Sequence, residues 1–235
     1  LYGIADAADE YVRTDVGGNK TNDVAITNGV WSGSRVGLQG SEDLGGGLRG
    51  IFNFEHRVSI DTGTQTNAGI TGTNNPASNA VGGSVTGSFW QQSYVGLAGG
   101  FGEIRLGRDY TVGFRALLPG DTTGYSWYYN ASGGSTVTGT SNAGLGGFTV
   151  RQSNAVQYIT PSLGGFKLWT MYGAGEQVAS TKLGDMWQVG GVGNWGPVGL
   201  GLFYGRSKVG TAATQLDRDE LGASIDRKST RLNSS

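Results

Sequence analysis

The sequence predicts an all-β protein whose strands run antiparallel and follow one another in an up-and-down order. Three observations support this: glycine supplies 45 of the 235 residues, short runs of alternating apolar and polar residues recur, and the connections between these runs alternate between short and long. A glycine inside a helix costs about 1 kcal/mol relative to alanine, so long helices are disfavoured. Alternation with a period of two indicates strands that have two different faces.

The composition excludes several classes of function. The chain has no cysteine and a single histidine, His56, which excludes disulfide frameworks, thiolate ligands and multi-histidine metal sites. Seventeen Lys and Arg stand against 18 Asp and Glu, so no strong net charge would attract nucleic acid or an anionic membrane surface. No apolar run approaches the roughly 18 residues that a membrane-spanning helix requires. The chain begins at Leu1 inside a patterned segment, which we interpret as a cut N-terminus.

The alternation predicts ten strands. The first spans residues 1–11 and the last spans residues 219–225. Four hairpins lie between them, with short turns joining residues 35–39 to 48–55, 91–97 to 103–108, 153–160 to 166–172, and 186–195 to 198–204. Long connections rich in Thr, Asn, Ser and Gly cover residues 14–33, 61–88, 110–150, 173–185 and 208–218. This arrangement predicts one rim of tight turns and one rim of large loops.

Two architectures fit strands of this kind. A soluble sandwich would turn the apolar face, such as Phe166, Leu168 and Tyr172, into a core, whereas a membrane barrel would turn it to lipid and line a lumen with the polar face. Tyrosine and tryptophan near strand ends favour the barrel, because aromatic residues gather at membrane interfaces. These aromatic residues are Tyr2, Tyr11, Trp90, Tyr110, Tyr158, Tyr172, Trp187, Trp195 and Tyr204. The pattern alone leaves a soluble or surface-exposed binding or adhesion sandwich open.

Five short motifs follow one another along the chain. They are LYG with Asp6 at the start, SRVGLQGSEDLG at 34–45, QSYVGL at 92–97, FGEIRLGRDY at 101–110, and SNAVQY at 153–158 followed by Pro161 and GGF at 164–166. In this order and spacing they resemble the general diffusion porins of Gram-negative bacteria, most closely those of beta-proteobacteria. The resemblance runs from Leu1 to about Asp226.

The resemblance implies an antiparallel up-and-down transmembrane β-barrel of the 16-stranded porin type, of which about ten strands are present here. We therefore interpret residues 1–226 as part of a porin barrel, an N-terminal fragment of about two-thirds. Residues 110–150 would form the third loop, which folds inward and constricts the channel. Residues 227–235 break the alternation and resemble translated adapter or vector sequence, the alternative being a genuine polar loop.

The implied function is passive diffusion of ions and small hydrophilic solutes through a water-filled channel in the bacterial outer membrane. The implied partners are two further copies in a homotrimer, membrane lipid and lipopolysaccharide, with no nucleic acid. The function needs no catalytic residue, no metal and no cofactor. An outer-membrane barrel hydrolase is the less favoured alternative, because the chain has no Gly-x-Ser-x-Gly nucleophile elbow.

The resemblance also assigns residues to the constriction and to the pore lining. Arg35 and Arg151 match basic residues of the wall, and Asp121 matches the acidic part of the third loop. Two departures occur: Ile4 stands where some relatives carry lysine, and Gln91 where many carry arginine. Between residues 110 and 150 the only charged side chains are Asp121 and Arg115, so we expect a weak transverse field and no strong ion selectivity.

Six further residues have expected places in the pore. Arg49, Lys167, Arg105 and Glu55 are expected to face the lumen. Arg108 and Asp109 are expected to anchor the base of the third loop. Each assignment has a structural alternative: the basic residues would be solvated without affecting conductance, and Asp121 would cap a turn.

Overall fold

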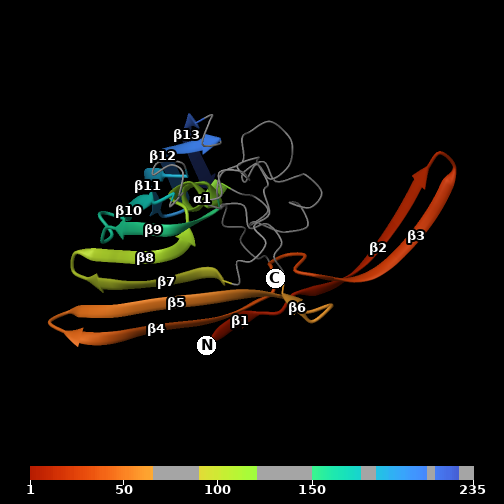
Figure 1. Ribbon diagram of the computed structural model, residues 1–235, viewed down its shortest axis with the longest axis horizontal. Coiled ribbons are helices and arrows are strands. Elements are labelled where there is room, and N and C mark those ends of the chain that lie inside the picture. The colour runs from red at the N-terminus through yellow and green to blue at the C-terminus, as the bar shows by residue number, and fades with distance from the viewer. Residues whose placement is uncertain (66–89, 121–149, 176–183, 211–214, 228–235) are drawn as a thin grey trace.

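The computed structural model describes residues 1–65, 90–120, 150–175, 184–210 and 215–227. Its main feature is one curved antiparallel sheet in which ten strands follow the order β1-β4-β5-β7-β8-β9-β10-β11-β12-β13 (Figure 1). The strands are β1 Tyr2–Ile4, β4 Arg35–Gly45, β5 Leu48–Ser59, β7 Trp90–Gly99, β8 Gly102–Tyr110, β9 Arg151–Ile159, β10 Phe166–Gly173, β11 Met186–Trp195, β12 Val198–Gly210 and β13 Gln215–Arg227. A two-residue strand, β6 (Thr64–Gln65), pairs with the end of β5. The predicted up-and-down order of ten strands is confirmed in the described part of the chain.

The first strand and its loop differ from the prediction. Residues 1–11 do not form one strand, because β1 ends at Ile4 and β2 (Ala7–Val16) pairs with β3 (Asn19–Asn28) in a separate hairpin. This hairpin projects from the side of the sheet that bears the long connections (Figure 1). Its turn consists of Gly17 and Gly18, with φ of +59° and +86°, the left-handed geometry that a two-residue hairpin turn favours. The prediction of a loop over residues 14–33 is therefore wrong. The two strands of the hairpin are rich in polar residues, so they do not show the apolar alternation that was used to predict strands.

The loop expected at residues 208–218 is also shorter than predicted. β12 continues to Gly210 and β13 begins at Gln215, and Lys208 lies opposite Asp217. The Lys208 Nζ lies 2.6 Å from Asp217 Oδ1, so a cross-strand charge pair extends the hairpin beyond its apolar part.

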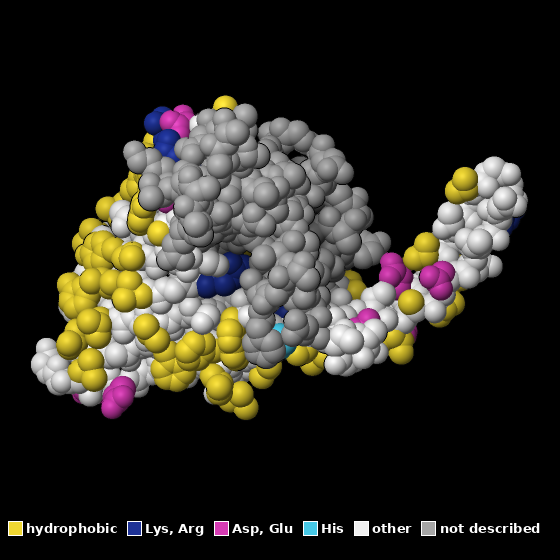
Figure 2. Space-filling view, in the orientation of Figure 1, with side chains coloured by type: hydrophobic (Ala, Val, Ile, Leu, Met, Phe, Trp, Pro, Cys, Tyr) yellow, Lys and Arg dark blue, Asp and Glu magenta, His cyan; other side chains and the backbone are white. Residues whose placement is uncertain are grey.

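Apolar side chains cover the outside of the sheet and polar side chains line its inside. Val36, Phe52 and Leu168 on the outer face are 43%, 39% and 41% exposed. On the inner face the side chains of Gln157 and Gln188 are buried. Figure 2 shows the hydrophobic residues on the outer surface of the sheet, with Lys and Arg visible in the hollow. This distribution is the reverse of a soluble sandwich, which would bury Val36, Phe52 and Leu168 together.

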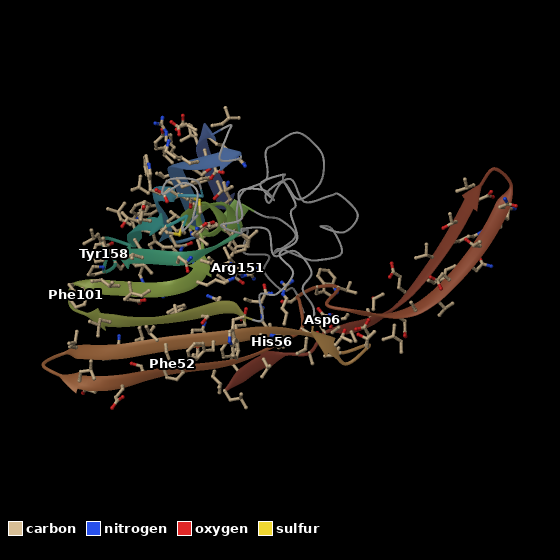
Figure 3. The ribbon with its side chains drawn as sticks, in the orientation of Figure 1. Asp6, Phe52, His56, Phe101, Arg151 and Tyr158 are labelled. Carbon is tan, nitrogen blue, oxygen red and sulfur yellow. The ribbon has the colours of Figure 1, made fainter. Side chains whose placement is uncertain are left out.

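Exposed aromatic residues mark both ends of the outer face. Tyr158 and Trp195 lie toward the short turns, where the Tyr158 hydroxyl donates to the Phe101 carbonyl at 2.7 Å (Figure 3). Tyr172, Trp187 and Tyr204 lie toward the long connections, and the Trp187 and Tyr204 rings are 5.4 Å apart.

Three of the aromatic residues expected at the interfaces lie elsewhere. The Tyr2 hydroxyl donates to Asn53 and Glu55 on the inner face, and the Tyr110 ring stacks on Phe114 inside the arc. Tyr11 lies on the projecting hairpin. Position near a strand end does not reveal which face a side chain occupies, and this is why the expectation was wrong for these three.

The inner face of β10 to β13 carries a short helix. Helix α1 (Val112–Leu117) and the 3-10 turn η2 (Leu118–Gly120) directly follow β8. Thr111 caps α1 by accepting a hydrogen bond from the Phe114 amide at 3.1 Å. The helix packs on an apolar cluster that includes Ala155, Met171, Met186 and Phe203. The start of the predicted third loop therefore lies on the inner wall, while residues 121–149 fall outside the described part of the chain.

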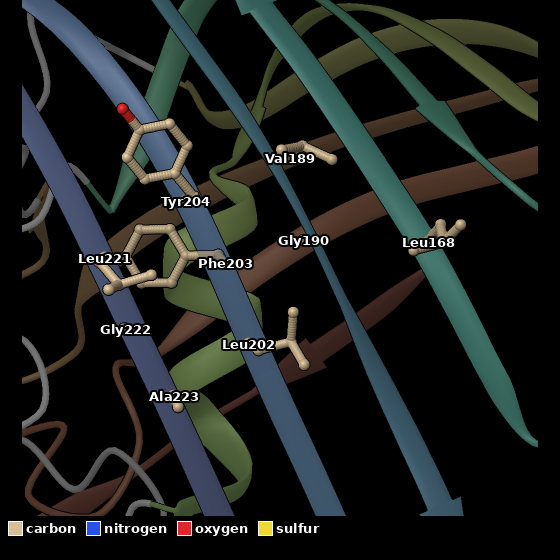
Figure 4. A pocket seen from close by; sticks show the side chains of 9 residues that line it. All are labelled: Leu168, Val189, Gly190, Leu202, Phe203, Tyr204, Leu221, Gly222 and Ala223. Carbon is tan, nitrogen blue, oxygen red and sulfur yellow. The ribbon is translucent and has the colours of Figure 1, made fainter.

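Glycines let this helix approach the wall closely. Figure 4 views the wall from outside, with the helix behind the strands and Phe203 between Gly190 and Gly222. A Cβ atom at Gly113 of α1 would lie 2.7 Å from the Phe203 ring, and one at Gly201 would overlap the Ala116 carbonyl. Gly190 and Gly222 lie in a shallow apolar groove of about 520 Å³ on the outer face, bordered by Leu168, Val189, Leu202 and Leu221. None of the helices in the described ranges has the length and apolar character needed to cross a membrane.

Candidate functional site

A group of polar residues lines the inner face of β1, β4 and β5. The register places Ile4 opposite Arg35, and Arg35 opposite Arg57, so the three side chains point to the same face. The Arg35 Nε lies 3.7 Å from Glu55 Oε2, and its Nη2 donates to Ser32 Oγ at 3.0 Å. Glu55 is 4% exposed and also accepts from the Tyr2 hydroxyl at 3.1 Å. Of the predicted residues, the structure thus brings Arg35 and Glu55 together.

Arg57 is an inner-wall residue that the sequence analysis missed. It is buried and lies directly across the β4–β5 hairpin from Arg35. Arg57 lies two residues after Glu55 on the same strand, so the alternation that places Glu55 on the inner face was the signal that could have revealed it.

Asp6 fixes the segment that supports Arg35. Its Oδ2 accepts hydrogen bonds from the backbone amides of Trp31 and Ser32 at 2.9 and 2.6 Å. Asp6 lies where the β2–β3 hairpin leaves the sheet (Figure 3). The carboxylate therefore holds Ser32 in place beneath the Arg35 guanidinium.

Asp109 joins the wall to the helix. Its Oδ1 accepts from Gln92 at 2.6 Å and from Arg115 of α1 at 3.2 Å, and its Oδ2 accepts from Arg105 at 2.8 Å. Arg105 also pairs with Glu103 at 2.7 Å. Two guanidinium groups thus face two carboxylates, so this group carries little net charge, and Asp109 itself is 2% exposed.

Arg151 lies in a stack of aromatic and cationic groups beside Asp109. Its Nη2 donates to the Tyr110 hydroxyl at 2.9 Å, and its guanidinium lies 4.5 Å from the centre of that ring. Tyr110 stacks on Phe114 with 4.7 Å between centroids. Arg151 is 2% exposed and forms no ion pair with any described residue. Arg108 is also buried and donates from Nη1 to Ser153 Oγ at 2.8 Å, in an irregular part of the β8–β9 pairing.

The remaining predicted residues do not join these groups. Gln91 is buried at the start of β7. Arg49 and Lys167 are exposed near the short turns, at the far end of the sheet from Arg151. Asp121 lies outside the described residues. His56 packs edge-on to Trp90, with the ring centroids 6.1 Å apart, and the described ranges contain no cluster of three potential metal ligands.

Comparison with known proteins gives a consistent result. A family model described as Gram-negative porin matches residues 1–233. The chain is 34% identical to outer membrane porin protein 32 of Delftia acidovorans over 235 residues, covering 96% of this chain and 59% of that protein. It is 29% identical to an outer membrane porin of Bordetella pertussis over 187 residues, covering 73% of this chain and 41% of the relative. The chain therefore spans about three-fifths or less of the length of these relatives.

Solved structures show the same fold. The anion-selective porin from Comamonas acidovorans superposes with a TM-score of 0.65 at 28% identity, covering 94% of this chain and 61% of that one. OmpF of Salmonella typhi superposes with a TM-score of 0.54 at 15% identity, covering 92% and 59%, and supports the fold alone. With an outward apolar face, a polar inner face and a family match along almost its whole length, the chain belongs to the Gram-negative porin family of outer-membrane β-barrel proteins.

Proposed function

We propose that the chain forms part of the wall of a water-filled channel through which ions and small hydrophilic solutes diffuse passively. The observation that carries this proposal is the helix at residues 112–117, which lies on the inner face directly after β8 and is held there by the Asp109–Arg115 pair. A segment in this place reduces the width of the lumen. We infer that residues 110–150 as a whole form the constriction, with Arg108 and Asp109 as its anchor.

The barrel is completed in this proposal by strands beyond residues 1–226. The backbone edges of β1 and β13 have no partner strand in the described part of the chain, and an open edge is unfavourable in lipid, where no water can satisfy it. Apart from Arg227, which ends β13 opposite Val198, residues 227–235 would contribute nothing to the barrel. The family resemblance further implies a homotrimer in contact with membrane lipid and lipopolysaccharide.

We further propose that the channel has a modest preference for anions. Arg35, Arg57 and Arg151 outnumber Glu55 and Asp226 along the inner wall, whereas the charges around Asp109 cancel and Arg218 pairs with Glu220. The similar Comamonas porin is described as anion-selective. Arg49 and Lys167 would add positive potential near the turn side, and Gln91 and Asp121 would complete the constriction. Such a function needs no catalytic residue, no metal and no cofactor.

The test is conductance of the full-length porin that carries this sequence, reconstituted in a planar bilayer. We expect stepwise conductance increases and, under a KCl gradient, a zero-current potential of the sign that anion preference gives. Protein that stays soluble without detergent and gives no conductance steps would contradict the channel. Steps with a cation-selective potential would contradict only the anion preference.

A further inference from the structure

A recess of about 480 Å³ lies on the inner wall, where α1 and η2 rest against β10, β11 and β13. Leu118, Pro119, Trp169 and Val192 supply its apolar lining. Arg115, Asn194 and Asp226 supply its polar groups. The recess therefore combines an apolar body with a few charged and amide groups, the composition typical of small-molecule sites.

A glycine in β12 keeps the floor of this recess low. A Cβ atom at Gly199 would lie 3.2 Å from Asn194 Oδ1 and 3.8 Å from the Cβ of Asp226 and from the Cβ of Pro119. The intervening strand therefore adds no side chain between Asn194 on one side and Asp226 on the other.

Arg115 provides the positive end of the recess. Its guanidinium stacks 4.5 Å from the centre of the Trp169 ring and donates from Nη2 to Asp109 at 3.2 Å. Asp109 also accepts from Arg105, so one carboxylate is shared between two guanidinium groups. The Arg115 side chain is 27% exposed, and a guanidinium has five N–H donors. Donors thus remain for an anionic group.

Asp226 provides the negative end. It is half-buried on the inner face of β13 and forms no ion pair with any residue that the structure describes. Trp169 on β10 and Asp226 on β13 are separated by three strand spacings, about 14 Å, and by a register offset of four residues, about 13 Å along the strands, because Trp169 aligns with Gly222. The helix side bridges this distance: a Cβ atom at Gly199 would lie 3.8 Å from the Cβ atoms of both Pro119 and Asp226, and Pro119 follows Arg115 by about one helical turn, roughly 6 Å. Arg115 and Asp226 therefore lie at the two ends of the recess.

We propose that the recess binds small zwitterions whose carboxylate and protonated amine lie at opposite ends of an apolar body. Arg115 receives the carboxylate, Asp226 receives the ammonium group with the Asn194 amide beside it, and Trp169 and Val192 contact the body. This proposal rests on the channel function, since solutes reach the recess from the lumen.

The test is isothermal titration of the full-length porin in detergent micelles with 4-(aminomethyl)benzoate. Two analogues keep the ring and lose one charge each: 4-methylbenzoate has no amine and 4-methylbenzylamine has no carboxylate. We expect the zwitterion to bind about fivefold more tightly than either analogue, the gain that a partly exposed ion pair gives. Equal affinity for all three compounds, or no binding of the zwitterion, would overturn the proposal.

Two variants locate the binding. Asp226→Asn should lower the affinity for the zwitterion to that of 4-methylbenzoate and leave the latter unchanged. Gly199→Val should weaken all three compounds by filling the floor, and Asp217→Asn on the outer rim should alter none. An Asp226→Asn variant that keeps the preference for the zwitterion would refute the assignment. Binding is read without conductance, so a porin that binds but gives no conductance steps would refute the channel function and leave the recess standing.

Discussion

The inner faces of the two halves of the sheet are built on different principles. Behind β10 to β13 the wall carries Met171, Met186 and Phe203, and a helix covers them. Behind β4 and β5 the wall carries Asn53, Glu55 and Arg57, and these residues pair with neighbouring side chains. An apolar inner face is stable only where a second layer shields it from water. The comparison teaches that one half of the wall supplies apolar bulk to the inner face while the other supplies charge.

Asp109 lies at the boundary between the two halves, and its replacement should have the largest effect. Asp109→Asn removes the charge that holds Arg105 and Arg115, and breaking a buried charge pair costs about 3–5 kcal/mol. We expect a corresponding loss of unfolding free energy, measured by urea titration in lipid vesicles. Asp217→Asn, whose carboxylate is exposed on the outer rim, is the matched control and should change nothing measurable. Equal stability of both variants would show that Asp109 does not join the halves.

A charge placed on the outer face tests whether both halves turn the same surface to lipid. Leu106 lies in the middle of β8 and is 49% exposed. Leu106→Arg should cost about 2–4 kcal/mol of unfolding free energy in vesicles, the range for an arginine at the bilayer midplane. The control Leu163→Arg places the same side chain in the β9–β10 turn and should cost about 0–1 kcal/mol. Similar costs at both positions would argue against a lipid-facing surface.

A substitution at Gly201, where α1 rests on the wall, tests the apolar half of the inner face. A methyl group at Gly201 would overlap the Ala116 carbonyl, whereas one at Gly100 would meet no atom within 4 Å. Gly201→Ala should cost about 1–3 kcal/mol by overpacking and should lower single-channel conductance, because the helix is pushed away from the wall and further into the lumen. Gly100→Ala should leave both quantities unchanged. A Gly201→Ala channel with unaltered conductance would separate the helix from the constriction.

The charged half of the inner face is tested by the variant with the smallest expected effect. Arg35→Gln removes one cation from the inner wall and should shift the zero-current potential in a KCl gradient toward cation preference. Arg206→Gln removes an arginine from the outer rim, where it pairs with Asp219 at 2.7 Å, and should leave the potential unchanged. If both variants shift the potential equally, net charge rather than the inner wall sets the preference.

The sequence predicted what depends on neighbouring residues. Alternation along each strand assigned Val36 and Leu168 to the outer face, and glycine-rich segments such as residues 196–197 located the tight turns. Contacts between distant segments could not be predicted in this way. Gly201 of β12 meets Ala116 of α1, 85 positions away in the sequence (201 minus 116), and no local sequence feature marks this contact. The inward turn of Tyr2 depends on register across strands, which alternation within one strand leaves open, whereas Arg57 could have been predicted from the alternation that includes Glu55. The pore-lining roles of Arg35, Gln91, Arg151 and Asp121 stay predictions.

Where Gly201 meets Ala116, main chain rests directly on main chain, so no side chain sets the local spacing between loop and strand. Ordinary substitutions in β12 can only push the two apart; none can bring them nearer. Such substitutions can therefore only narrow the aperture of the proposed channel on this side, and variation that widens it must arise in the loop itself, while variation in charge remains available on the opposite side at the level of single residues. The width of the proposed channel and its ionic preference can in this way evolve independently within one molecule.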